Sequence, residues 1–101
     1  MHVHSDPTSV YTGRPVLDER GIALGAISDI VYDELGQPEY LVVDPGIFRA
    51  SHYVPVDGSR ATPNGEVVVP WDKCWFKQAP KANGQHFLSS LDRHLLAVHY
   101  A

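Results

Sequence analysis

The stretch that decides the fold runs over residues 22–33 and reads IALGAISDIVYD. It is rich in the β-branched, aliphatic and aromatic residues that suit strands, and turn-forming residues bound it on both sides. Gly25 interrupts this strand, where a glycine costs stability unless a β-bulge or a sharp bend leaves no room for a side chain. The stretch therefore predicts a long, bent strand.

The apolar residues of this strand fall on two alternating faces. One parity holds Leu24, Ala26, Ile30 and Tyr32, and the other holds Ile27 and Val31. A bulge between the two sets would let both face inward. We therefore expect an interruption of the strand pairing within this segment.

Outward from this strand, short apolar runs alternate with glycine-containing turns. Strands are expected over residues 13–18, 22–33, 40–43, 51–56 and 66–70. The run at 40–43 is apolar on both faces, which suggests a central strand, and Asn64-Gly65 is the strongest hairpin signal. This rhythm predicts a mainly β fold, a small antiparallel β-barrel or sandwich.

The C-terminal part changes character. Residues 81–84 read as a linker, and Ser89 begins a pattern typical of a helix start, which predicts a short helix over about residues 90–99. Leu91, Leu95 and Val98 recur at helical spacing. We expect them to dock the helix either on its own barrel or on a neighbouring subunit. The expected organisation is a flexible N-terminal tail (1–11), a barrel domain (12–80), and a linker with a C-terminal helix (81–101).

Length and composition exclude several classes of protein. A chain of 101 residues makes one domain, and its apolar runs are far shorter than the roughly 20 residues that a membrane-spanning helix needs. The N-terminus lacks the apolar run of a secretory signal. The single cysteine, Cys74, cannot form an internal disulfide, which favours a cytoplasmic location.

The charge distribution argues against nucleic acid and anionic membranes as direct partners. The net charge is −4, with eight acids and three bases in residues 1–50 and four acids and five bases in residues 51–101. The one basic grouping is Lys73, Lys77 and Lys81. An anion-facing strip is one interpretation of these lysines, but a solvated edge is favoured over it.

The six histidines do not indicate a metal site. His2 and His4 form a pair in the expected tail, while His94 and His99 lie five apart on the expected helix rather than four. His52 and His86 are isolated. The sequence predicts no metal and no cofactor.

Catalytic chemistry also lacks a recognisable arrangement. Cys74 has Lys73 and Lys77 nearby but no base at an interpretable spacing, so buried packing is the favoured role for this thiol. The acids at strand ends are expected to cap turns through backbone amides rather than to form catalytic pairs; they are Asp18, Asp29, Asp33, Asp44 and Asp57. No catalytic residue is predicted.

The large aromatic residues supply most of the expected core, since a domain of this size has few other bulky side chains. They are Trp71, Trp75, Phe76, Tyr53, Phe48 and Tyr40. Ile47-Phe48 is a special case, because it follows Pro45-Gly46 at a loop tip. Either these two residues form an exposed partner site, or the loop folds back over the end of the barrel.

These residues together resemble the PRC-barrel family, which takes its name from the photosynthetic reaction centre H subunit. The resemblance covers residues 12–80 and is most specific over 24–30. It rests on Gly13, Val16, Asp18, Gly21, Leu24-Gly25, Ile27, Asp29-Ile30, Asp33 and Gly36, then Leu41-Val42-Val43, Val54-Pro55, Val69-Pro70 and Ala79-Pro80.

The resemblance implies a small SH3-like barrel that acts as a non-enzymatic adaptor, and the C-terminal segment looks like that of stand-alone bacterial members. We expect the protein to bind itself as a homodimer or higher oligomer, and to bind a further, unidentified protein. Candidate interface residues are Ile47, Phe48, Leu91, Leu95 and Val98, and Ile47 and Phe48 are the expected contacts of self-association. The alternatives are a ribosome-assembly accessory that binds a ribosomal protein, an accessory subunit of a photosynthetic complex, and a hydrolase or metal-dependent enzyme.

Overall fold

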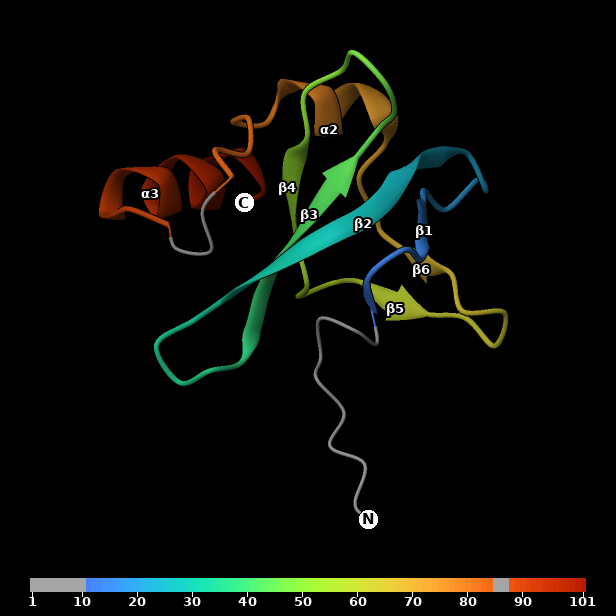
Figure 1. Cartoon of the computed structure of the whole chain (residues 1–101), viewed down its shortest axis with the longest axis horizontal. Helices are drawn as coiled ribbons and strands as arrows, with labels where there is room; N and C mark the ends of the chain where they lie inside the picture. Colours follow the sequence, from blue (N-terminus) through green and yellow to red (C-terminus); the bar gives the residue numbers. More distant parts are fainter. Residues whose placement is uncertain (1–10, 85–87) are drawn as a thin grey trace.

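The computed structural model describes residues 11–84 and 88–101, which form one curled six-stranded sheet and two helices (Figure 1). Residues 1–10 of the expected tail, with His2 and His4, lie outside the described residues, and so does His86. The mainly β architecture predicted from the sequence is confirmed, in the form of a half-barrel with a short C-terminal helix.

The sheet has the strand order β4-β3-β2-β1-β6-β5. Its strands are β1 (Pro15–Leu17), β2 (Ala23–Tyr32), β3 (Pro38–Asp44), β4 (His52–Pro55), β5 (Arg60–Ala61) and β6 (Val67–Val68). Neighbours are antiparallel except β1 and β6, which pair in parallel. The short β5 was not predicted. It pairs with β6 across the turn that contains the predicted Asn64-Gly65 signal.

Gly25 lies where β2 crosses the end of β3. A Cβ at this position would stand 2.3 Å from the carbonyl oxygen of Asp44 and 2.9 Å from the Cα of Pro45. Both contacts are with backbone atoms, which have little freedom to move aside. Close backbone approach is therefore the reason for the glycine.

The predicted bulge in β2 is present. The pairing with β3 shifts between Ile27 and Asp29. As a result Leu24, Ile27 and Ile30 face one core of the protein, and Val31 belongs to a second. Ala26 was predicted to face inward and is exposed instead. A second register shift, in the pairing of β2 with β1 next to Leu24 and Gly25, puts Leu24 and Ile27 on the same face and leaves Ala26 on the solvent side.

Apolar side chains cover both faces of the sheet. The inner cluster fills the half-barrel and contains Val16, Leu24, Ile27, Ile30, Leu41, Val43, Val54, Val67, Val69 and Phe76. The outer cluster lies on the opposite face of β2–β4 and contains Val31, Tyr40, Val42, Tyr53, Leu88 and Leu96. Burial on both sides explains why the central run at 40–43 is apolar throughout, as predicted.

Helix α2 (Lys73–Gln78) was not predicted from the sequence. Asp72 caps it by accepting a hydrogen bond from the amide of Trp75 at 2.8 Å. Phe76 is the buried residue of this helix and enters the inner cluster. The prediction of a buried Cys74 is wrong, because the thiol lies on the exposed side of the same helix.

Helix α3 (Ser90–His99) confirms the predicted helix, and Ser89 caps it by accepting from the amide of Asp92. The expectation that Leu91, Leu95 and Val98 dock the helix on its own barrel is wrong. Leu96 is fully buried against the barrel, whereas the three predicted residues are exposed.

Candidate functional site

The loop between β3 and β4 presents two large apolar side chains to solvent. Ile47 is 81% exposed and Phe48 is fully exposed, so of the two interpretations of this loop, the one in which it folds back over the barrel is wrong. Asp44 accepts a hydrogen bond from the amide of Gly46 at 2.9 Å, and the amide of Arg49 is 3.3 Å from the carbonyl of Gly46. The loop is thus closed by local hydrogen bonds.

Phe48 also has a strained backbone. Its φ of +66° makes it the one non-glycine residue of the described chain in the left-handed region. That conformation costs an L-residue with a bulky side chain about 1–2 kcal/mol. The chain therefore carries strain at the position where it exposes an aromatic ring, which is a pattern typical of binding loops.

The second exposed apolar surface is a stripe on α3 formed by Leu91, Leu95 and Val98, hereafter the outer stripe. Leu91 is 65% exposed, Leu95 44% and Val98 64%. Because consecutive helix residues point about 100° apart, Leu96 faces away from this stripe. One face of α3 is therefore fixed to the barrel through Leu96, and the apolar outer stripe points to solvent.

Polar contacts fix the orientation of α3. Arg93 forms an ion pair with Glu39 at the start of β3, and the hydroxyl of Tyr100 donates to the carbonyl of Tyr53 at 2.6 Å. Burial raises the pKa of Tyr100, so its phenol stays protonated and remains a donor. The sequence pattern alone favoured the more regular stripe, and these long-range partners explain why Leu96 is the buried residue.

Aromatic residues join α3 to α2. The rings of Trp75 and His99 stack with centroids 4.6 Å apart, and Trp71 meets Tyr100 edge to face at 4.8 Å. The indole N–H of Trp75 donates to the carbonyl of His99, and His99 Nε2 lies 2.8 Å from the carbonyl of Trp75. Trp75 was predicted to be core. It is partly exposed and instead connects the two helices.

The strand-end acids serve mainly as turn caps, as predicted. Asp18 accepts from the amides of Arg20 and Ile22, and these bonds lower the pKa of its carboxyl despite its burial. Asp33 accepts from the amides of Leu35 and Gln37 in the same way. These carboxylates therefore act as hydrogen-bond acceptors for the backbone amides of their own turns.

The described residues offer little for catalysis or metal binding. No group of three or more His, Cys, Asp or Glu side chains able to hold a metal ion occurs within residues 11–84 and 88–101. Cys74 accepts a contact from the Gln78 amide at 3.3 Å. The Nδ1 atom of buried His52 lies 2.7 Å from the carbonyl oxygen of Ala79, within hydrogen-bond distance. This histidine therefore has a structural role.

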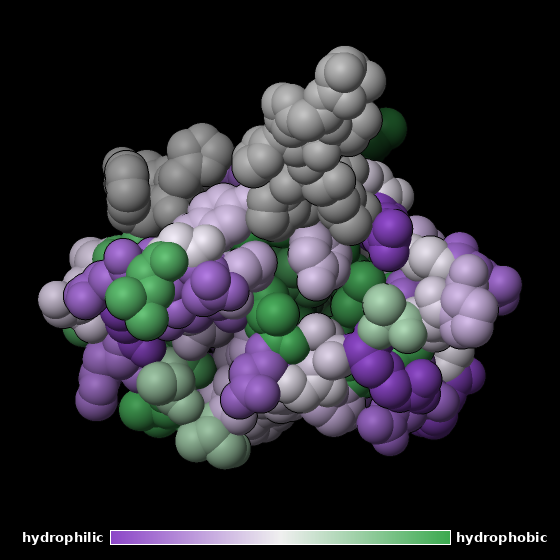
Figure 2. Space-filling model, turned by 90° about the horizontal axis from the view of Figure 1, so that it is seen from below, coloured by the Kyte–Doolittle hydropathy of each residue, from purple (hydrophilic) through white to green (hydrophobic). Residues whose placement is uncertain are grey.

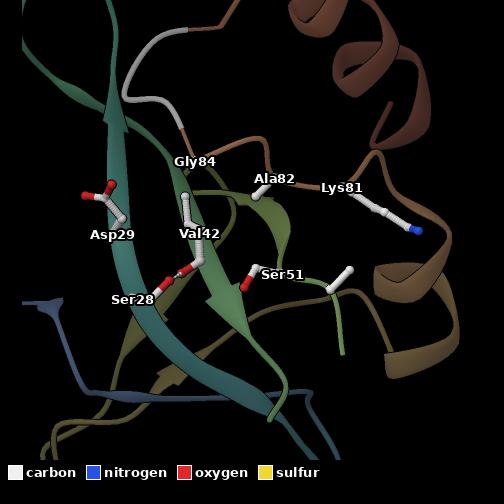
Figure 3. A pocket seen from close by; sticks show the side chains of 8 residues that line it. Ser28, Asp29, Val42, Ser51, Lys81, Ala82 and Gly84 are labelled. Atoms are coloured by element: carbon white, nitrogen blue, oxygen red, sulfur yellow. Dashed lines mark hydrogen bonds between the residues drawn. The ribbon is translucent and has the colours of Figure 1, made fainter. Parts of the chain in front are cut away.

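One hollow of about 450 Å³ lies on the outer side of the sheet beside residues 81–84 (Figure 3). The Ser28 hydroxyl in it donates to the carbonyl of Val42 at 3.3 Å. Asp29 and Lys81 point away from each other and out of the hollow (Figure 3). Its polar side chains therefore do not converge on a common point, as a catalytic centre requires.

The exposed apolar residues at the end of the molecule that carries the β2–β3 turn, away from the β3–β4 loop, are scattered. Figure 2 shows the end that carries the β2–β3 turn, where small hydrophobic patches alternate with hydrophilic residues as far as the grey atoms leave the surface visible. Leu35 belongs to this turn and is exposed, without a neighbouring apolar stripe on its own segment. It provides a natural comparison for the residues of α3.

Comparison with known proteins identifies the barrel. The sequence profile of the PRC-barrel domain matches residues 9–85, about three quarters of the chain. The match includes all six strands and α2, and it ends before α3. The chain matches no curated protein. None of the helices in the described part of the chain is long and apolar enough to span a membrane.

Proposed function

The chain belongs to the PRC-barrel family, a family of small binding and adaptor domains, and from that premise we propose that it is a non-enzymatic protein-interaction domain that self-associates. The observation that carries this proposal is the outer stripe of α3. Leu91, Leu95 and Val98 stay exposed although the same helix is firmly anchored through its opposite face. Exposed apolar surface that a rigid fold holds in place is typical of protein interfaces.

The outer stripe suits a two-fold contact between two copies of α3. Its three aliphatic side chains extend over two helical turns, and a symmetric dimer would place Leu95 near the two-fold axis. In an antiparallel pair, Asp92 near the start of one helix would approach the end of the other, where His99 lies. Antiparallel packing also sets opposite helix dipoles side by side.

The loop tip is the weaker candidate for a symmetric contact. A two-fold interface centred on Phe48 would bring Arg49 of one copy close to Arg49 of the other. Like charges at an interface oppose association. We therefore assign Ile47 and Phe48 to a different protein partner and the outer stripe to self-association.

A cytoplasmic location fits this proposal. Cys74 is a free, exposed thiol on α2. Exposed free thiols persist in a reducing compartment and are prone to oxidation outside one.

Sedimentation or light scattering over a range of protein concentrations tests self-association. We expect the wild-type chain to shift from monomer to dimer, Leu95→Asp to remain a monomer, and the control Leu35→Asp to dimerise like the wild type. A wild-type chain that is monomeric at about 100 μM would contradict the proposal, since its Kd would then be weaker than that of a functional homodimer. Dimers of unchanged strength in Leu95→Asp would reject the outer stripe as the interface.

A further inference from the structure

A second hollow, of about 330 Å³, lies between the β3–β4 loop, the start of β4 and the end of α2. We call it the basic hollow. It is lined by Pro45, Arg49, Ala50, His52, Lys77 and Lys81. Three cationic side chains, Arg49, Lys77 and Lys81, thus reach one concavity from two segments of the chain that are far apart in sequence.

These cations lack the usual partners. No acidic residue lines the basic hollow, and within the described part of the chain the ion pairs of Arg and Lys side chains are those of Arg20 and Arg93. The nearest acid in sequence, Asp44, directs a carboxylate oxygen to the amide of Gly46. Because the chain as a whole carries a net charge of −4, this grouping opposes the overall charge of the protein.

The backbone that carries the cations is held in place. His52 bonds to the carbonyl of Ala79, a β-bridge joins His52 to Lys81, and the amide of Ala82 donates to the carbonyl of Ser51 at 2.8 Å. The segment that carries Lys81 therefore runs along β4 as if it were one more strand. A ligand would meet a backbone that is already ordered, which lowers the entropic cost of binding.

The surroundings of the basic hollow indicate the class of ligand. Arg49 follows directly after Ile47 and Phe48, the two most exposed apolar residues beside the hollow. A lone small anion would make no use of these side chains. Nucleic acid is normally bound by a basic stripe that follows many phosphates, whereas this site is compact and lies on an acidic protein.

We propose that the basic hollow and the loop tip together bind an acidic segment of a partner protein. Carboxylates of that segment would lie among Arg49, Lys77 and Lys81, and an apolar side chain beside them would pack on Phe48. Guanidinium and ammonium groups are the natural partners of carboxylates. This inference rests on the proposed role as an interaction domain and names the chemistry of its partner.

The test is a titration followed by amide NMR spectra of the labelled full chain. The probe is a short peptide of glutamates interleaved with leucine and tryptophan, and its counterpart has lysine at every glutamate position. A single-stranded DNA of equal charge serves as the second comparison. We expect the acidic peptide to shift the amides of residues 45–50 and 77–81, and to bind more weakly as salt is added.

The double charge reversal Arg49→Glu with Lys77→Glu should weaken binding of the acidic peptide about tenfold, since each exposed attraction becomes a repulsion. Both side chains are on the surface, so the spectrum of the free variant should keep the dispersion of the folded protein. The matched control is Arg60→Glu on the exposed strand β5, which should leave the Kd within about twofold of the wild-type value.

Four results would overturn the inference. They are no shifts around the basic hollow at millimolar peptide, equal binding of the lysine peptide, tighter binding of the DNA, and equal loss of affinity in Arg60→Glu. The monomeric variant Leu95→Asp should bind the acidic peptide as the wild type does. If self-association fails its own test while the peptide still binds, only the dimer is rejected; if dimers form and no peptide binds, only the basic hollow is rejected.

Discussion

The two faces of the sheet are buried in different ways. The inner face is filled mainly by side chains of the strands. Among the buried residues that the structure describes there, Phe76 of α2 is the one that belongs to a helix. The outer face is closed by Leu88 and by Leu96 of α3, which come from the end of the chain. The family match ends at residue 85, so the inner core belongs to the matched barrel. Leu88 and α3, which we call the outer cover, are an addition to it.

This difference bears on where partners bind. In this chain α3 occupies the outer face of β2–β4 and covers Tyr40 and Tyr53. Groups of neighbouring exposed apolar side chains lie instead on the far side of α3 and on the β3–β4 loop. The interaction surfaces that we propose therefore lie on α3 and on the β3–β4 loop rather than on the sheet itself.

The largest expected effect concerns the inner half of this comparison. Gly25→Ala should destabilise the protein by about 4 kcal/mol or more, in the range reserved for severe steric conflict, because the new Cβ would overlap the backbone of Asp44 and Pro45. Chemical denaturation measures the change. The matched control is Gly36→Ala in the open β2–β3 turn, where a positive φ but no neighbouring atom opposes a side chain, so the cost should be about 1 kcal/mol. Equal losses in the two variants would show that the close approach at Gly25 is unimportant.

The outer half of the comparison is tested by two adjacent residues of α3. Leu96→Ala should cost about 3 kcal/mol, because it opens a cavity under a fully buried side chain. Leu95→Ala should cost less than about 1 kcal/mol in dilute solution, since this side chain is 44% exposed. Denaturation at two protein concentrations sharpens the result. A penalty for Leu95→Ala that grows with concentration would support the dimer, whereas a larger penalty for Leu95 than for Leu96 would invalidate the placement of the helix.

A single hydroxyl tests how firmly the outer cover is attached. Tyr100→Phe removes the hydrogen bond to the carbonyl of Tyr53 and keeps the ring against Trp71. The loss should be about 1.5 kcal/mol, because a buried acceptor loses its donor. Tyr11→Phe is the control on the inner side, since the hydroxyl of Tyr11 makes no hydrogen bond within the described part of the chain. Similar stabilities for wild type and Tyr100→Phe would mean that packing alone holds the cover.

The contrast between the faces also explains what the sequence could predict. The bulge in β2, the buried run at 40–43 and the caps at Asp18 and Asp33 depend on neighbouring residues, and all are present. Local patterns were sufficient because alternation, turn chemistry and glycine spacing specify the barrel directly. The existence of α3 was predictable for the same reason, through its N-cap and its helical spacing.

Features that depend on distant partners escaped prediction. Leu91, Leu95 and Val98 form the more regular apolar stripe. The orientation of the helix, however, is set by contacts with Glu39 and Tyr53, which lie more than forty residues upstream of their partners Arg93 and Tyr100. In this orientation Leu96 is the buried residue. Helix α2 was missed because its six residues are too few for a clear period, although Asp72 is a recognisable cap. The basic hollow was hidden for a related reason, since Arg49 joins the lysine series only in three dimensions.

The smallest expected effect is a pH dependence at the end of β1, on the barrel side of the comparison. Asp18 has a pKa below its ordinary value of 3.8, chiefly because its carboxylate accepts the amide of Ile22, with the amide and charge of Arg20 adding to the effect. A lowered pKa means that the folded state prefers the ionised form. The stabilisation is therefore complete above about pH 4, where the unfolded chain is also ionised, and is lost as the pH falls through the lower pKa of the folded state.

Asp18→Asn should accordingly destabilise the protein at neutral pH, and the gap to the wild type should close as the solution is acidified below pH 4. The change in the gap comes from the wild-type protein, whose stability falls with pH, because the neutral amide of the variant does not titrate in this range. Denaturation midpoints measured between pH 7 and pH 2 give the result, and hydrogen exchange locates it. Protection should fall first at the turn that follows β1, while the amides of α3, whose anchors are Arg93, Leu96 and Tyr100, should follow only global unfolding. A constant gap across this pH range would mean that the charge of Asp18 contributes nothing and that its hydrogen bonds act as those of a neutral cap.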